Sequence, residues 1–139
     1  MTAKALSFCY GLDSTHGLPF ICMIEGTLKG MCFLIDSGST ECITFKSCVE
    51  QYNDRFIEKA DKGTIWGVGG VTYKTRYVDA DTVFCGKENR IPFQVIDDAP
   101  SDRLYEETGI RMHGILGTNF MKANNMMIDF VNERVLVLD

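Results

Sequence analysis

The sequence lacks a long apolar run, and this absence limits how the chain can relate to a membrane. No apolar segment approaches the roughly 18 to 20 residues that a membrane-spanning helix requires. The first residues, Met1 to Lys4, are not followed by the apolar core of a signal peptide. We therefore expect a soluble chain with no membrane segment, cytoplasmic by default.

Positive charge is also scarce. Lys and Arg together number 14 against 19 Asp and Glu, which gives a net charge of -5. Binding to nucleic acid requires Lys and Arg clustered against phosphates, and the sequence contains no such cluster. The sequence therefore argues against a nucleic-acid partner.

A regular spacing of metal ligands is the third absence. The sequence contains six cysteines: Cys9, Cys22, Cys32, Cys42, Cys48 and Cys85. They form no CxxC pair and no metal-ligand spacing with either histidine. Several lie in apolar runs, where a thiol behaves as a small hydrophobic side chain. We expect free, mostly buried thiols in a reducing compartment, with no disulfide framework, no metal and no cofactor.

The composition that remains is that of a globular protein. Hydrophobic residues make up 45% of the 139 residues and charged residues 24%, which argues against disorder. A chain of this length can bury one good hydrophobic core but not two. We therefore expect a single domain over residues 1–139.

Short segments of β-branched and aromatic residues, separated by Gly, Asn and Asp, run along most of the chain and predict an all-β fold. A short helix is expected over residues 102–108 with Ser101 as its cap, and another ending near Asn124. Residues 46–53 are expected to form a surface turn or short helix. Strands are expected at residues 5–10, 18–25, 31–35, 41–45, 62–66, 71–84, 91–96, 126–130 and 134–138.

One apolar strand ends abruptly in an acid, in the segment Phe-Leu-Ile-Asp-Ser-Gly-Ser-Thr at residues 33–40. A carboxylate at the end of a buried strand must be charge-paired, hydrogen-bonded or partly protonated. Gly38 permits a tight turn, and the hydroxyls of Ser37 and Ser39 can donate to the carboxylate of Asp36. Because these residue types also form ordinary turns, the segment alone is compatible with either a strand-to-turn junction or a catalytic acid.

A glycine cluster occupies the middle of the chain. It consists of Trp66, Gly67, Val68, Gly69 and Gly70. Flanking β-branched and aromatic residues predict a hairpin with a flexible tip, which we interpret as a flap. A phosphate-binding loop is the alternative, but such loops open into a helix, whereas residues 71–78 alternate at strand period. Trp66 is interpreted either as a core residue or as part of the wall of the substrate-binding site.

A third segment places two aliphatic residues before a glycine. Ile115, Leu116 and Gly117 are followed by a segment with helical character. His113 precedes them, and we interpret it as a structural or exposed histidine and not as a general base.

These three segments, in this order, resemble the retropepsins, which are the retroviral-type aspartic proteases and their bacterial relatives. The resemblance extends from about Leu18 to Phe130. The segment 36–39 matches the family signature Asp-Thr/Ser-Gly-Ala/Ser, residues 66–71 resemble its flap, and residues 115–119 resemble its second signature. The resemblance implies an acid-protease barrel with a flap hairpin and one short C-terminal helix, acting on extended peptides.

Only one acid-hydroxyl-glycine motif is present, since Asp13-Ser14-Thr15 lacks the glycine. Hydrolysis by two acids requires one carboxylate to take a proton from water while the other polarises the peptide carbonyl. A bilobed pepsin-like monomer is excluded on length and motif count. The resemblance therefore implies a homodimer in which Asp36 of each chain forms the dyad. In aspartic proteases two such acids share one proton. The resemblance implies that the two Asp36 side chains of the dimer do the same.

The resemblance also implies roles for the neighbours of Asp36. Ser37 is expected to hydrogen-bond across the two-fold axis. Ser39 is expected to donate to the outer carboxylate oxygen and to favour the ionised acid. Ile115, Leu116 and Gly117 are expected to brace the turn.

Two positions depart from the retroviral pattern, because Thr40 and Thr118 stand where an acid and an arginine are usual. No unpaired charge remains, so we expect a different dimer interface, with residues 134–139 as a candidate inter-subunit strand. A non-catalytic dimerisation or peptide-binding module is the alternative function. A carboxylate-pair glycosidase would need a second acid with similar strand-end support, which the sequence lacks.

Overall fold

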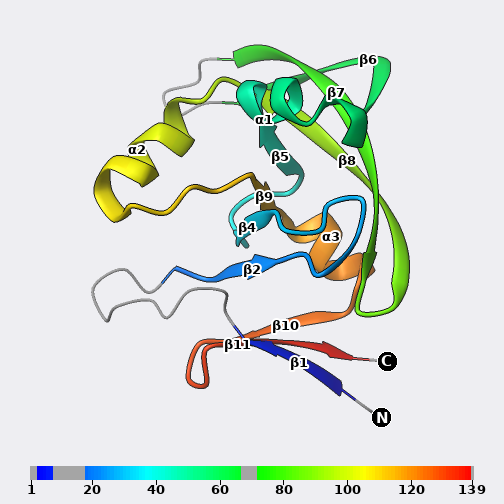
Figure 1. Ribbon diagram of the computed structural model, residues 1–139, viewed down its shortest axis with the longest axis vertical. Coiled ribbons are helices and arrows are strands. Elements are labelled where there is room, and N and C mark those ends of the chain that lie inside the picture. The colour runs from blue at the N-terminus through cyan, green and yellow to red at the C-terminus, as the bar shows by residue number, and fades with distance from the viewer. Residues whose placement is uncertain (1–2, 8–17, 67–71, 139) are drawn as a thin grey trace.

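The computed structural model describes residues 3–7, 18–66 and 72–138 (Figure 1). The described residues form two β-sheets and a few short helices, which confirms the predicted all-β class. The larger, eight-stranded sheet contains β2 (Phe20–Cys22), β3 (Glu25–Gly26), β4 (Cys32–Ile35), β5 (Cys42–Phe45), β6 (Ile57–Trp66), β7 (Thr72–Phe84), β8 (Lys87–Ile96) and β9 (Gly114–Leu116). The smaller, three-stranded sheet contains β1 (Ala3–Ser7), β10 (Met126–Asp129) and β11 (Arg134–Leu138).

Helices occur at more places than the single C-terminal helix that the fold class implies. They are α1 (Lys46–Gln51), the short 3₁₀ helix η1 (Asn53–Arg55), α2 (Ala99–Thr108) and α3 (Thr118–Ala123). The last of these is the predicted C-terminal helix, and α1 with η1 occupies the segment predicted as a turn or helix. No helix in the described ranges has the length and apolar character needed to cross a membrane.

Helix α2 begins earlier than the sequence predicts. It starts at Ala99, because Pro100 has the backbone geometry of a first helical turn and needs no hydrogen-bond acceptor there. Ser101 is therefore inside the helix and does not cap it. Its buried hydroxyl donates instead to the Met112 carbonyl oxygen at 3.3 Å. The prediction of a Ser101 cap was wrong.

The strand that precedes Asp36 is fixed in the hydrophobic core. Phe33 is fully buried, and its ring stacks on Phe93 of β8 with centroids 5.9 Å apart. Burying a side chain of this size contributes about 1.5 to 3 kcal/mol to stability. The position at which β4 ends is consequently set by core packing.

The order of the central strands determines where the loop after Asp36 must run. β4 pairs in parallel with β9, and β5 pairs with the opposite edge of β9 in the antiparallel direction. β9 therefore lies between two strands that are consecutive in the sequence. The connection over residues 36–41 has to cross the C-terminal end of β9, which brings the predicted first and second signatures together.

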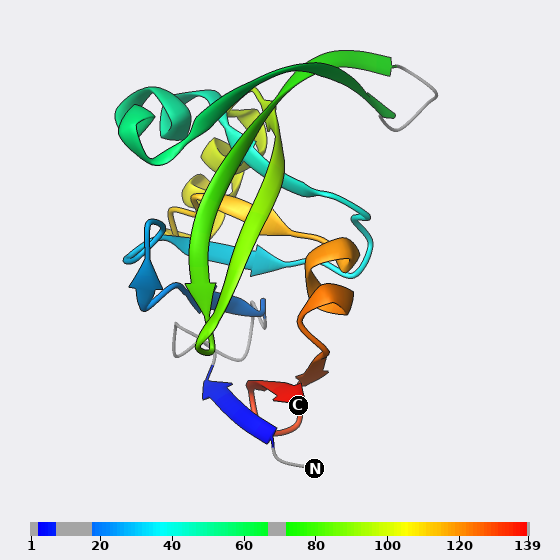
Figure 2. The ribbon, with the colours of Figure 1, turned by 90° about the vertical axis from the view of Figure 1, so that its right-hand side faces the viewer.

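β6 and β7 form a long antiparallel hairpin that projects from the body of the molecule (Figure 2). Its outer register runs from Lys62 opposite Arg76 to Trp66 opposite Thr72. This confirms the predicted hairpin. The residues predicted to form its tip, Gly67, Val68, Gly69 and Gly70, lie outside the described residues.

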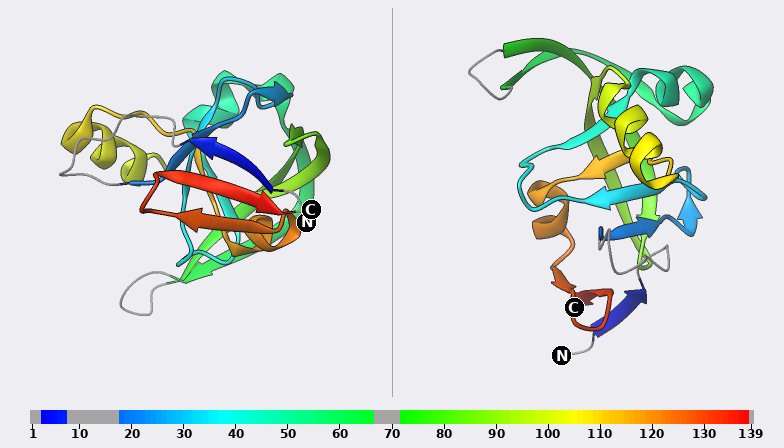
Figure 3. Two further views of the ribbon diagram at one scale, coloured as in Figure 1. Left: turned by 90° about the horizontal axis from the view of Figure 1, so that it is seen from below. Right: turned by 90° about the vertical axis from the view of Figure 1, so that its left-hand side faces the viewer.

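The smaller sheet corrects one prediction. β11 is its central strand, with β1 on one side and β10 on the other, as seen from below in Figure 3. Both edges of β11 are thus occupied within the chain. The proposed inter-subunit strand at residues 134–139 cannot pair with another chain while these contacts persist, and the sheet edges are β1 and β10.

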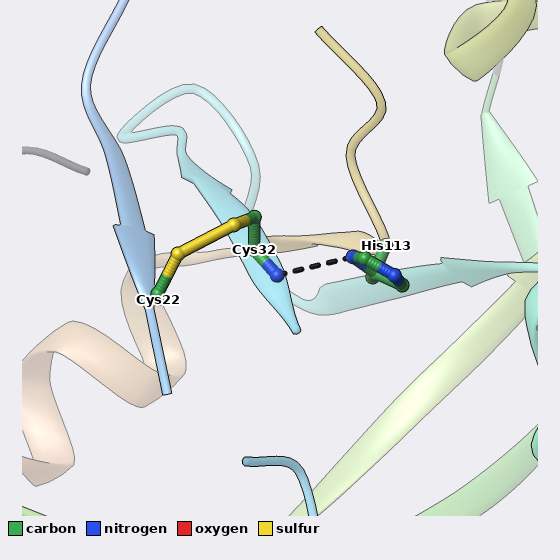
Figure 4. Close-up of a disulfide and its surroundings, with 3 residues drawn as sticks. All are labelled: Cys22, Cys32 and His113. Atoms are coloured by element: carbon green, nitrogen blue, oxygen red, sulfur yellow. Dashed lines mark hydrogen bonds between the residues drawn. A yellow bond between two sulfur atoms is a disulfide. The ribbon is translucent and has the colours of Figure 1, made fainter. Parts of the chain in front are cut away.

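A disulfide contradicts the expectation that the cysteines are free. Cys22 and Cys32 face each other across the antiparallel pair of β2 and β4, with Cα atoms 4.3 Å apart (Figure 4). This close separation is typical of a pair not joined by backbone hydrogen bonds, which brings opposing side chains together. Cys42, Cys48 and Cys85 are free, and burial raises the pKa of the Cys42 thiol to about 11.

Candidate active site

The turn that begins at Asp36 is held by backbone hydrogen bonds. The Asp36 N–H donates to the Leu116 carbonyl oxygen at 3.1 Å, which continues the pairing of β4 with β9 by one residue. The Gly38 N–H donates to Oδ1 of Asp36 at 2.8 Å, and the Ser39 N–H donates to the Asp36 carbonyl oxygen at 3.1 Å. These bonds fix the half-buried carboxylate at the end of the strand.

Two glycines allow neighbouring backbone to approach β9 closely, Gly117 toward the crossing loop and Gly114 toward β5. A Cβ atom at Gly117 would lie 2.4 Å from the Glu41 carbonyl oxygen and 2.6 Å from that of Ser39. A Cβ atom at Gly114 would lie 2.5 Å from the Ile43 carbonyl oxygen. Real Cβ atoms do not approach oxygen this closely, so both positions require glycine. Gly117 thereby permits the contact of the two predicted signatures.

The first turn of α3 completes the support for the loop. The N–H groups at the start of a helix have no partner within it. Here the N–H of Thr118 donates to the Ser39 carbonyl oxygen at 2.8 Å, and that of Asn119 donates to the Thr40 carbonyl oxygen at 2.9 Å. The segments containing Thr40 and Thr118 are thus joined through backbone atoms, without the ion pair usual at these positions in the retroviral pattern.

The structure shows where the side chains predicted to support Asp36 lie. Ser39 does not support the carboxylate directly, because its hydroxyl donates its single hydrogen to the Glu41 carbonyl oxygen at 2.7 Å. This corrects the predicted donation to Asp36. Ser37 is exposed. Leu116 is fully buried beneath the turn, and Ile115 pairs with Leu34 and Ile43 on the flanking strands.

His113 has a structural role, in line with its interpretation from sequence. Its Nδ1 accepts a hydrogen bond from the Cys32 backbone N–H at 3.1 Å (Figure 4), and the backbone N–H of His113 donates to the Cys32 carbonyl oxygen at 2.8 Å. The Thr44 hydroxyl donates to the His113 carbonyl oxygen at 2.9 Å. Burial lowers the pKa of His113, which favours the neutral imidazole that can accept a hydrogen bond.

The structure also reveals a cavity that was not predicted from the sequence. It has a volume of about 280 Å³ and adjoins the crossing loop. On its wall, the Tyr77 hydroxyl donates to Oε2 of Glu41 at 3.2 Å and accepts from Nε2 of Gln94 at 2.6 Å. The cavity is lined by Glu41, Cys42, Lys59, Tyr77, Asn89, Arg90, Ile91, Pro92, Asn119, Phe120 and Ala123.

Comparisons with known proteins identify the fold. No protein-family profile and no curated protein sequence matches the chain. Its structure is similar to a retropepsin-like aspartic protease from Rickettsia conorii, with a TM-score of 0.62 and 15% identity over 98% of this chain and 89% of that one. The chain therefore has the retropepsin-like fold, as the resemblance of its motifs predicts.

Two further solved structures were matched. One is the EIAV protease complexed with the inhibitor HBY-793, with a TM-score of 0.47 and 15% identity over 82% of this chain and 91% of that one. The other is the retroviral protease-like domain of Ddi1 from Leishmania major, with a TM-score of 0.44 and 21% identity over 78% and 81% of the respective chains.

Proposed function

We propose that the protein is an aspartic endopeptidase whose catalytic dyad consists of Asp36 from each of two chains. The observation that supports this most directly is the Asp36 turn. Backbone atoms hold it against β9 and α3, and the carboxylate has no cationic partner among the described residues. An acid that is fixed in place, half-buried and uncompensated is suited to proton transfer.

The proposed reaction is the hydrolysis of a peptide bond by an activated water. The ionised Asp36 of one chain takes a proton from water, and the protonated Asp36 of the second chain donates a hydrogen bond to the scissile carbonyl. The deprotonated water attacks the carbonyl carbon and forms a tetrahedral intermediate. The C–N bond of this intermediate breaks as the dyad passes the proton taken from water to the departing amine, which leaves the carboxylic acid product and restores the single-proton dyad. Since the dyad must hold one proton, activity is confined to the pH range in which the pair carries a single negative charge.

The residues around the dyad have supporting roles in this proposal. Ser37 hydrogen-bonds across the two-fold axis, and Gly38 and Gly117 maintain the turn. The β6–β7 hairpin, together with the glycine cluster at residues 66–70 that resembles the family's flap, closes over an extended peptide. It supplies backbone hydrogen bonds to the peptide and excludes water.

We place the dimer contact at the smaller sheet. Its edge strands, β1 and β10, have no in-chain partner on their outer sides within the described residues. Such edges pair readily with another chain. Met127 on β10 and Val131 just beyond it are large apolar residues that are exposed in the single chain. This surface is suited to pairing with a second copy.

Incubation with a peptide library between pH 3 and pH 7, with and without a statine-type inhibitor, tests the function. We expect cleavage by the wild-type protein, inhibition by the statine compound, and loss of activity in Asp36→Asn. Asp54→Asn is a matched control, because Asp54 is exposed on η1 and has no contact with the proposed site. Cleavage that survives Asp36→Asn would eliminate the mechanism.

Solution mass at the concentration of the assay tests the dimer. A strict monomer that cleaves peptides would contradict the shared dyad. A dimer that binds peptides but cleaves none would favour the non-catalytic module.

A further inference from the structure

The cavity beside the crossing loop joins the region of the proposed dyad to the flap hairpin. Glu41 and Asn119 come from the loop and from α3, and the Asn119 N–H binds the Thr40 carbonyl oxygen. Lys59 and Tyr77 come from the two strands of the hairpin. Figure 2 shows the loop and the outer part of the hairpin on the same side of the molecule. The cavity is therefore lined by the two segments that the proposed function places around the peptide.

The charges on the cavity wall are unequally compensated. The Lys59 ammonium lies 3.5 Å from Oδ1 of Asp79. The Arg90 guanidinium forms two hydrogen bonds to Asp81, at 2.7 and 2.9 Å. Glu41, in contrast, is bound by a neutral hydroxyl and has no cationic partner among the described residues. The wall therefore presents two neutralised cations and one unneutralised carboxylate.

A hydrogen-bonded chain holds this carboxylate in place. Gln94 is 6% exposed, and its amide donates to the Tyr77 hydroxyl, which then donates to Oε2 of Glu41. This hydrogen-bonded chain uses only Oε2 of Glu41, and no described residue forms a hydrogen bond to Oε1. A carboxylate that is oriented before a ligand arrives binds a cation with less loss of conformational entropy.

The rest of the lining suits the stem of a long basic side chain. Ile91 and Phe120 are buried apolar residues on the wall, and Pro92 adds an exposed apolar surface. Lys and Arg place an apolar stem along such surfaces while their charged end reaches a polar partner. A purely apolar side chain would leave the Glu41 carboxylate desolvated without a partner, which is unfavourable.

We propose that this cavity binds a Lys or Arg side chain of the peptide substrate and that Glu41 is the residue that selects it. This inference rests on the proposed peptidase function. The basic side chain pairs with Glu41, and its stem lies against Ile91 and Phe120. An extended peptide directs alternate side chains to the same face, so one position of the substrate carries the preference.

A positional library tests this selectivity. Each substrate position is occupied in turn by Lys, by norleucine, which has an apolar chain of similar shape, or by Glu. We expect a preference of about tenfold in kcat/KM for Lys over norleucine at one position, equivalent to about 1.4 kcal/mol. In Glu41→Gln the ratio of kcat/KM for the Lys peptide to that for the norleucine peptide should fall to about one, because the KM of the Lys peptide rises. Added salt should weaken the preference of the wild-type protein.

Two further variants separate electrostatic selection from a structural effect. Tyr77→Phe removes the donor to Glu41 and should reduce the preference in part. Glu50→Gln, at an exposed position on α1, should preserve it. Equal cleavage of Lys and norleucine peptides by the wild-type protein, or an undiminished preference in Glu41→Gln, would overturn the inference.

The proposed selectivity of the cavity can also be tested if the protein does not cleave peptides. If the wild-type protein cleaves no peptide, the same labelled peptides are compared by fluorescence anisotropy. Tighter binding of the Lys peptide that is lost in Glu41→Gln would support the cavity and reject only the chemistry. Equal binding of the Lys and norleucine peptides would reject the cavity as well.

Discussion

The two ends of β4 differ in how much side chains contribute to holding them. At the end that leads into Asp36, the contacts come from backbone groups of Ser39, Leu116 and Thr118 and from the bare Cα of Gly117. At the opposite end, Cys32 is held by a disulfide to Cys22 and by the His113 imidazole. The first arrangement leaves nearby side chains available for a ligand, whereas the second uses them for structure.

The largest effect is expected where a side chain is added to the backbone-held end. In Gly117→Ala the new methyl group would meet two carbonyl oxygens, so the crossing loop must move away from β9. We expect a loss of about 3 kcal/mol in the free energy of unfolding, measured by chemical denaturation, together with loss of any peptidase activity.

Gly30→Ala is the matched control for this substitution. Gly30 has a positive φ of 87°, but a Cβ there would meet nothing within 4 Å. The control should therefore lose only the roughly 1 kcal/mol associated with a left-handed backbone. If the two variants lose equal stability, close approach is not what holds the Asp36 turn.

A smaller effect is expected at the end held by side chains. Replacing Cys22 and Cys32 together by Ser removes a disulfide between residues separated by 10 in sequence. We expect the free energy of unfolding to fall by about 2 kcal/mol, since a short disulfide loop constrains the unfolded chain less than a long one. Chemical denaturation under non-reducing conditions measures this.

The control for the disulfide is the wild-type protein treated with a reducing agent. It should reach the stability of the double Ser variant, and the variant itself should not respond to the reagent. A response of the variant would show that another cysteine contributes.

The smallest effect is a pH dependence at His113. Because burial lowers its pKa in the folded state, the unfolded chain takes up a proton at higher pH than the folded one. The stability contributed by the neutral imidazole is thus complete above the ordinary histidine pKa, roughly 6.5, and declines as the pH falls below it. Denaturation curves at pH 7.5 and 5.0 measure the decline.

His113→Asn sharpens this test, because an Asn carbonyl oxygen can take the place of Nδ1 as the acceptor for the Cys32 N–H but does not titrate. The variant should lose less stability than the wild type between these two pH values. Parallel pH profiles would mean that other groups are responsible for the decline.

The sequence was informative where a feature lies in one continuous segment. The Asp36 turn and the β6–β7 hairpin each depend on neighbouring residues whose local preferences agree with the final fold. The contact between the Asp36 loop and Gly117 was anticipated only through the resemblance to retropepsins, since residues so far apart in sequence carry no local signal of their contact.

The features that were missed depend on tertiary pairing. The Cys22–Cys32 disulfide requires the register of β2 with β4, and the cavity requires Glu41, Tyr77 and Gln94 from three strands or loops to converge. Glu41 lies two residues after the signature at residues 36–39, and this position is the signal that could have drawn attention to it. The acceptor of the Ser39 hydroxyl depends on the path of the loop, which a residue pattern does not define.

The pairing of β1 with β11 has a consequence for how the chain folds. Ala3 lies opposite Leu138, so the smaller sheet joins residues from nearly the whole length of the sequence. Contacts at such separation carry a large loop-closure entropy and tend to form late. The Asp36 cradle, built from residues 33–45 and 113–119, can therefore form before this sheet closes, and β1 can detach and rejoin without dismantling it.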